Sequence, residues 1–100
     1  MSEPKDIDEL YYKYPQLFPK NCIECNVGWY EIIDHMCLAI QTYINKEFSD
    51  EILFPEFKYI REKFGVLDIH IQDTDHIIEI VKKSCEILSY HTCEYCGDEG

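Results

Sequence analysis

The stretch from Cys22 to Phe48 reads CIECNVGWYEIIDHMCLAIQTYINKEF and contains the longest regular apolar pattern in the chain. Its apolar side chains recur every three or four positions, at Trp29, Ile32, Ile33, Met36, Cys37, Ile40, Tyr43, Ile44 and Phe48. A stripe of this period predicts an amphipathic helix from Trp29 to Phe48. We expect this helix to form the core of the fold.

A shorter helix is expected before it, from Asp6 to Tyr14. Its apolar residues fall on one helical face, at Ile7, Leu10, Tyr11 and Tyr14. Pro15 ends this helix, because the residue before a proline avoids the α region. The polar segment Met1 to Lys5 is expected to be frayed.

Two further elements are predicted after the long helix. Val66 to Gln72 alternates apolar and polar residues, which indicates a half-buried strand. Lys58 to Phe64 fits either a helix that Gly65 terminates or a strand that pairs with the first through a turn at Gly65. We favour the hairpin.

A second long helix is predicted from the helix-start cluster Asp73-Thr74-Asp75 to about Tyr90. Its apolar stripe is formed by Ile77, Ile78, Val81, Cys85 and Leu88. The 100 residues thus predict one small α+β domain, with two long helices, a short N-terminal helix and a β-hairpin. A domain of this size buries a small core and is often stabilised by a metal or by disulfides.

The composition is strongly acidic, with 20 acidic residues, 9 basic residues and a net charge of −11. Such a surface repels nucleic-acid phosphates and anionic membranes, which excludes both as main partners. The complementary partner is a protein with a basic surface. The alternative is that the acidity only keeps a small protein in solution. We expect an intracellular, reducing location, because the sequence shows neither an apolar leader nor a membrane-spanning run.

Four of the six cysteines form two Cys-x-x-Cys pairs, Cys22 with Cys25 and Cys93 with Cys96. Two cysteines at this spacing can direct both sulfurs at one ion, and structural Zn²⁺ takes four tetrahedral ligands. We therefore predict a structural zinc site formed by the four cysteines. Open alternatives are His91 as a replacement ligand, unligated reduced thiols, and disulfide or redox chemistry.

The other chemically active residues predict no reaction centre. Cys37 and Cys85 lie on apolar stripes and are expected in the core, while His70 is expected at the surface. Glu31, Asp34 and His35 lie on the polar side of the first long helix and could form an acid–base set only as helix neighbours. A four-cysteine zinc has no open coordination position. We therefore predict that the protein is not an enzyme.

Four short motifs, in matching order, are similar to those of a family of small phage and virus proteins. They are YPQLF at residues 14–18, GWYEIIDHMC at 28–37, REKFGVL at 61–67 and TCEYCG at 92–97. The resemblance covers most of the chain and implies a small α+β domain of viral origin, but no activity. Together with the intracellular location expected above, it leads us to expect the protein in the host cytoplasm. Its relatives continue past the second Cys-x-x-Cys into a segment that could bring further ligands; here Cys22 and Cys25 would take that place.

The charge and the resemblance lead to three hypotheses of function. The first is a viral interaction protein that binds a basic surface of a host or viral protein, for example to inhibit host defence. The second is a structural or virion-associated module whose acidity only aids solubility. The third is a small enzyme or redox protein, which the motifs favour least.

Overall fold

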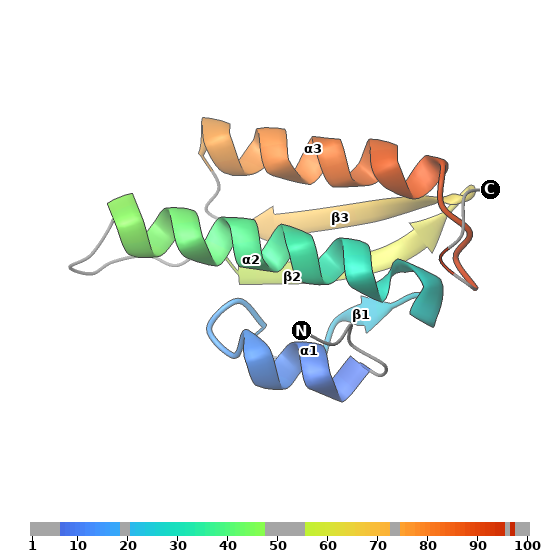
Figure 1. Cartoon of the computed structure of the whole chain (residues 1–100), viewed down its shortest axis with the longest axis horizontal. Coiled ribbons are helices and arrows are strands. Elements are labelled where there is room, and N and C mark those ends of the chain that lie inside the picture. The colour runs from blue at the N-terminus through green and yellow to red at the C-terminus, as the bar shows by residue number, and fades with distance from the viewer. Residues whose placement is uncertain (1–6, 19–20, 48–55, 73–74, 96, 98–100) are drawn as a thin grey trace.

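A computed structural model describes residues 7–18, 21–47, 56–72, 75–95 and 97. The elements, in chain order, are α1 (Ile7–Lys13), β1 (Ile23–Glu24), the 3₁₀ turn η1 (Val27–Trp29), α2 (Tyr30–Glu47), β2 (Glu56–Lys63), β3 (Val66–Gln72) and α3 (His76–Tyr90). The strands form one sheet in the order β1-β2-β3. Figure 1 shows α2 and α3 side by side along the sheet, with α1 next to β1. The predicted α+β class is confirmed.

Helix α2 supplies the centre of the core. Ile33, Met36 and Cys37 on its apolar stripe are fully buried. They belong to one cluster with Phe57 and Ile60 of β2, and with Leu67 and Ile69 of β3. The alternation predicted for β3 is confirmed, because Leu67, Ile69 and Ile71 are its buried residues. Burial of the apolar surface of this cluster makes the main favourable contribution to the stability of so small a fold.

Strands β2 and β3 pair antiparallel, with Lys63 opposite Val66 and two residues between them. Both turn residues have positive φ, 55° for Phe64 and 83° for Gly65, as a type I′ turn requires. Of the two readings of Lys58 to Phe64, the strand is the one found. A third strand was not predicted: β1 pairs parallel with β2, and its two residues are too few to show a periodic pattern.

The outer edge of β3 is covered by polar side chains of α3. The N–H of Leu67 donates to Ser89 Oγ at 2.8 Å, and the N–H of Ile69 donates to Glu86 Oε2 at 3.3 Å. Ser89 is fully buried and its hydroxyl donates in turn to the carbonyl oxygen of Glu86 at 2.6 Å. Side chains thus take the place of a fourth strand, which protects an edge that would otherwise be open to other chains.

The ends of the helices differ slightly from the expected ones. The first long helix is preceded by η1, and α3 begins after Asp75, whose carboxylate accepts the N–H of Ile78 at 3.0 Å. The expected helix ends at Asp6 and Phe48, the start signals Asp73 and Thr74, and the segment Met1 to Lys5 lie outside the described residues. Of the helices in the described ranges, none is long and apolar enough to cross a membrane.

Candidate metal centre and neighbouring polar clusters

The segments that carry the two Cys-x-x-Cys pairs are docked against each other. The N–H of Gly28 donates to the carbonyl oxygen of Glu94 at 2.6 Å, and Trp29 Nε1 donates to that of Thr92 at 2.9 Å. These bonds join the start of α2 to the chain just after α3. Two stretches more than 60 residues apart in sequence therefore meet where the zinc site was predicted.

Gly28 is required by this docking. A Cβ at position 28 would collide with the backbone oxygens of Cys93 and Glu94. The sequence alone does not reveal this requirement, because close approach of a distant segment leaves no local pattern. Gly97 completes the contact: it has a positive φ of 83°, and its N–H donates to the carbonyl oxygen of Cys93 at 2.9 Å.

Asn26 holds the two segments through its side chain. Its backbone N–H and its Nδ2 both donate to Glu94 Oε2, at 3.1 and 2.9 Å. The backbone of Asn26 is extended, with a φ of −90°. The carboxylate of Glu94 is satisfied by these amide donors.

The four predicted zinc ligands lie in different surroundings. Cys25 and Cys93 are half-buried at the docked segments. Cys22 is buried as part of the hydrophobic core, and its N–H donates to the hydroxyl of Tyr11 at 2.9 Å. Cys96 lies outside the described residues. Among the described residues, no three Cys, His, Asp or Glu side chains are gathered closely enough to hold a metal. The four-cysteine site stays a prediction.

Three of the thiols have raised pKa values. Burial, and then the nearby Glu94 carboxylate, raise the pKa of Cys25 to about 12. Burial also raises the pKa of Cys85 to about 11 and that of the fully buried Cys37 well above its usual range. Thiols with raised pKa values are weak nucleophiles at neutral pH, since the thiolate is the reactive form. Cys37 lies in the core as predicted, and Cys85 is half-buried against it.

Asp34 is buried, contrary to its expected place on the polar side of α2. Its Oδ1 accepts hydrogen bonds from Lys13 Nζ at 2.6 Å and from the hydroxyl of Tyr14 at 2.8 Å. Burial, and then the hydrogen bond to Asp34, raise the pKa of Tyr14. This network joins α2 to the end of α1 and satisfies the buried carboxylate.

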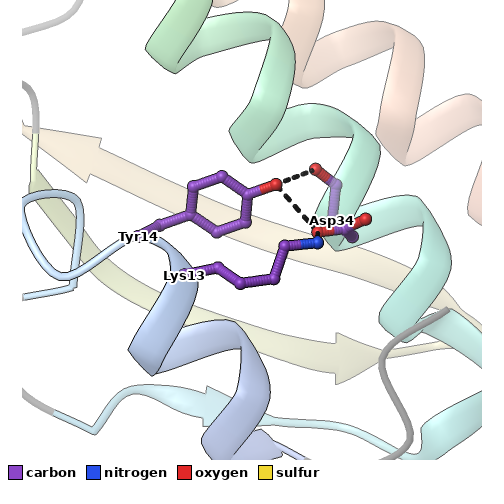
Figure 2. A network of polar contacts seen from close by, with 3 residues as sticks. All are labelled: Lys13, Tyr14 and Asp34. Carbon is purple, nitrogen blue, oxygen red and sulfur yellow. Dashed lines mark hydrogen bonds and ion pairs between the residues drawn. The ribbon is translucent and has the colours of Figure 1, made fainter. Parts of the chain in front are cut away.

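The acid–base set considered from the sequence does not assemble. Asp34 points to Lys13 and Tyr14, as Figure 2 shows, whereas Glu31 and His35 are exposed. Glu31 and His35 instead line a shallow hollow of about 190 Å³ beside the docked segments. Glu31 and His35, one helical turn apart, are neighbours as expected. The sequence did not show that Asp34 pairs with Lys13 of α1 instead.

The outer face of the sheet carries a stacked cluster that the sequence did not reveal. The rings of Tyr59 and His70 stack at 5.4 Å, and the guanidinium of Arg61 lies 4.2 Å from the centre of the Tyr59 ring. Arg61 Nε also pairs with Asp68 at 3.0 Å. His70 is exposed, as predicted. The cross-strand register places Tyr59 opposite His70 and Arg61 opposite Asp68, which explains both contacts.

Comparisons of the chain with protein-family models, with curated proteins and with solved structures found no match. The resemblance to small phage and virus proteins stays a prediction. Two of its motifs meet in space, because Gly28 and Trp29 contact Glu94 and Thr92.

Proposed function

We propose that the protein is an acidic, zinc-stabilised viral interaction protein that binds a basic surface of a host or viral protein. Inhibition of a host defence protein is one form that this binding could take. The observation that carries the proposal is the uneven distribution of charge. Residues 56–72 and 76–90 contain five acidic and five basic residues, so the rest of the chain, with fifteen acidic and four basic residues, carries the whole net charge of −11.

The acidic part includes the β1 edge of the sheet. Asp8 on α1 and Glu24 on β1 are exposed there, and Glu31 is exposed at the start of α2. Lys13, a basic residue of α1, pairs with the buried Asp34 and so does not offset them. An acidic edge attracts a basic protein surface, which speeds association and makes it depend on salt.

The zinc part of the proposal rests on the docked cysteine segments. Four thiolates from Cys22, Cys25, Cys93 and Cys96 would saturate a structural Zn²⁺ and leave no position for a substrate. Such an ion would link the start of α2 to the chain after α3. In a domain of this size, the free energy of metal binding contributes directly to folding.

Metal content tests the zinc site. We expect about one zinc per chain, lost when Cys22 and Cys25, or Cys93 and Cys96, are replaced by serine. Cys85→Ser is the control, because Cys85 lies on α3 outside both pairs. Zinc that survives replacement of Cys22 and Cys25 would contradict the four-cysteine site.

Salt-dependent binding tests the interaction. Proteins captured from host extract on the immobilised chain are expected to be basic, and their affinity should fall steeply as salt rises. The triple variant Asp8→Asn, Glu24→Gln, Glu31→Gln should weaken binding. The matched control is the triple variant Glu56→Gln, Glu62→Gln, Glu79→Gln. It changes the net charge by the same amount within residues 56–72 and 76–90, whose charges balance, and should weaken binding less. Binding that does not depend on salt, or the absence of any bound basic protein, would contradict the proposal.

The alternative functions have tests of their own. A structural or virion-associated module would be found in purified particles at fixed stoichiometry, and the acidity would then serve only solubility. A small enzyme or redox protein would lose an activity with Cys25→Ser while the fold stayed intact. Without a bound metal, the raised pKa of Cys25 keeps its thiol protonated at neutral pH, which does not favour that third function.

A further inference from the structure

A groove of about 610 Å³ lies between the tip of the β2–β3 hairpin and helix α3. Its apolar lining comes from both elements: Phe64, Val66, Leu67, Ile87 and Tyr90. Lys63 and Lys83 line it as well, one from each element. The groove lies at the β3 edge of the sheet, opposite the edge formed by β1.

Phe64 occupies a position that does not suit it. Its φ is 55°, in the left-handed region that favours glycine or asparagine. Its side chain is 92% exposed, so it buries almost nothing within its own chain. A strained residue that adds little to the fold is a reason to look for a role outside the fold.

Helix α3 presents large apolar residues to solvent beside Phe64. Ile87 is 60% exposed and Tyr90 is 66% exposed. Ile80 is also exposed and, with Lys83, follows the spacing of one helical face that contains Ile87 and Tyr90. Contiguous exposed apolar residues of this kind mark interaction sites in folded proteins.

The charged groups at the groove are unequally available. Asp68 pairs with Arg61, and Glu86 accepts the N–H of Ile69. Lys83 has no ion pair with any described residue, and Lys63 Nζ lies only near the ring of Phe64, at 5.9 Å. The groove therefore offers cations to a ligand while its carboxylates are occupied. A second copy of this chain fits poorly, because its charge of −11 is repelled far more strongly than a short segment with one or two carboxylates.

We propose that this groove docks a short segment of another protein in which large apolar side chains stand next to Asp or Glu. The apolar side chains lie between Phe64, Ile87 and Tyr90, where aromatic residues provide the main anchors. The carboxylates pair with Lys63 and Lys83 at the rim. This ligand is opposite in charge to the basic partner proposed above, and it binds at the other edge of the sheet.

Selection of random displayed peptides on the folded full-length chain tests the proposal. Enriched peptides are expected to combine at least two large apolar residues with Asp or Glu. Their affinity should fall about tenfold or more with Phe64→Asn and with Ile87→Ser, since both remove contacts at the centre of the groove. The double variant Lys63→Gln, Lys83→Gln should lower the affinity for these peptides, and the remaining affinity should depend less on salt concentration. Tyr12→Ser is the control, because Tyr12 is equally exposed but lies on α1.

The variant Phe64→Asn separates lost binding from lost fold. Asparagine tolerates the left-handed region, so the variant is expected to unfold at a temperature no lower than the parent chain. No enrichment, enrichment of basic peptides, or affinity unchanged by Phe64→Asn and Ile87→Ser would overturn the proposal. A dimer that Phe64→Asn abolishes would assign the groove to a second copy instead. The acidic-edge variant Asp8→Asn, Glu24→Gln, Glu31→Gln should leave peptide binding unchanged, so this test fails independently of the proposed function.

Discussion

Helices α2 and α3 show the same apolar period in sequence but lie at very different depths in the molecule. The apolar stripe of α2 is almost entirely buried, whereas in the stripe of α3 only Ile78 is buried and Val81 and Cys85 are half-buried. Both patterns correctly predict a helix. A helical spacing of apolar residues therefore indicates that a helix forms. It does not indicate how much of the apolar face of that helix the rest of the chain buries.

The cause lies in what each helix packs against. Helix α2 has the sheet on one side and the end of α1 on another, where Lys13 and Tyr14 satisfy its buried Asp34. Helix α3 lies beside α2 at the edge of β3, where Ser89 and Glu86 accept backbone N–H groups of the strand. Of its apolar stripe, only Ile78 joins the buried core, while Val81 and Cys85 pack partly buried against it. The exposed residues Ile87 and Tyr90 of α3 line the groove proposed to dock an acidic segment. Folding therefore depends mainly on α2, whereas α3 with the hairpin carries the second of the two proposed binding sites.

The same substitution in the two helices gives the largest expected contrast. Ile33→Ala in α2 removes fully buried methyl groups and should lower the free energy of unfolding by about 2–5 kcal/mol. Ile87→Ala in α3, at a mostly exposed position, should change it by less than about 0.5 kcal/mol. Urea unfolding followed by circular dichroism measures both. Similar losses at the two positions would remove the distinction between the helices.

Periodic features were predictable and non-local ones were not. The stripe of α2 and the alternation of β3 extend over many residues, so their elements and their buried faces were found. Strand β1 is too short for a pattern, and Gly28 is explained only by the distant Cys93 and Glu94. The candidate site was predictable to the extent that Cys-x-x-Cys spacing is local. The burial of Cys22 and the bonds of Asn26 to Glu94 depend on tertiary contacts that the spacing does not encode.

Gly28→Ala tests the joint between the two helices. The added methyl group meets backbone oxygens that cannot rotate away, so we expect a loss of about 3 kcal/mol in the free energy of unfolding, as for overpacked cores. Gly65→Asn is the control, because nothing lies within 4 Å of a Cβ there and asparagine tolerates its positive φ. A thermal melt measures both variants. An unchanged midpoint for Gly28→Ala would mean that the docked segments are not part of the stable fold.

Ser89→Ala tests how α3 is held to the sheet. The substitution leaves the N–H of Leu67 without its acceptor in a buried place, which should cost about 1–2 kcal/mol. Ser84→Ala, at an exposed position of the same helix, removes a hydroxyl without this loss and should have almost no effect. Hydrogen exchange of the Leu67 amide should also become faster in Ser89→Ala but not in Ser84→Ala. Equal effects of the two variants would show that α3 is not anchored through Ser89.

The start of α3 gives the smallest effect, and it depends on pH. Burial of Asp75 opposes its ionisation, but hydrogen bonds from the Tyr43 hydroxyl and from the N–H groups of Ile78 and Ile77 outweigh it, so the pKa lies below its ordinary value of 3.8. A carboxylate with a lowered pKa in the folded state stabilises the fold above the unfolded pKa, and this contribution disappears as pH falls through the folded pKa. Asp75→Asn keeps a good helix cap but removes the ionisable group. Below about pH 4 the parent chain should therefore lose stability that the variant does not, by up to about 1 kcal/mol. If the free energy of unfolding fell equally with pH in the two chains over this range, the role assigned to the ionised carboxylate would be contradicted.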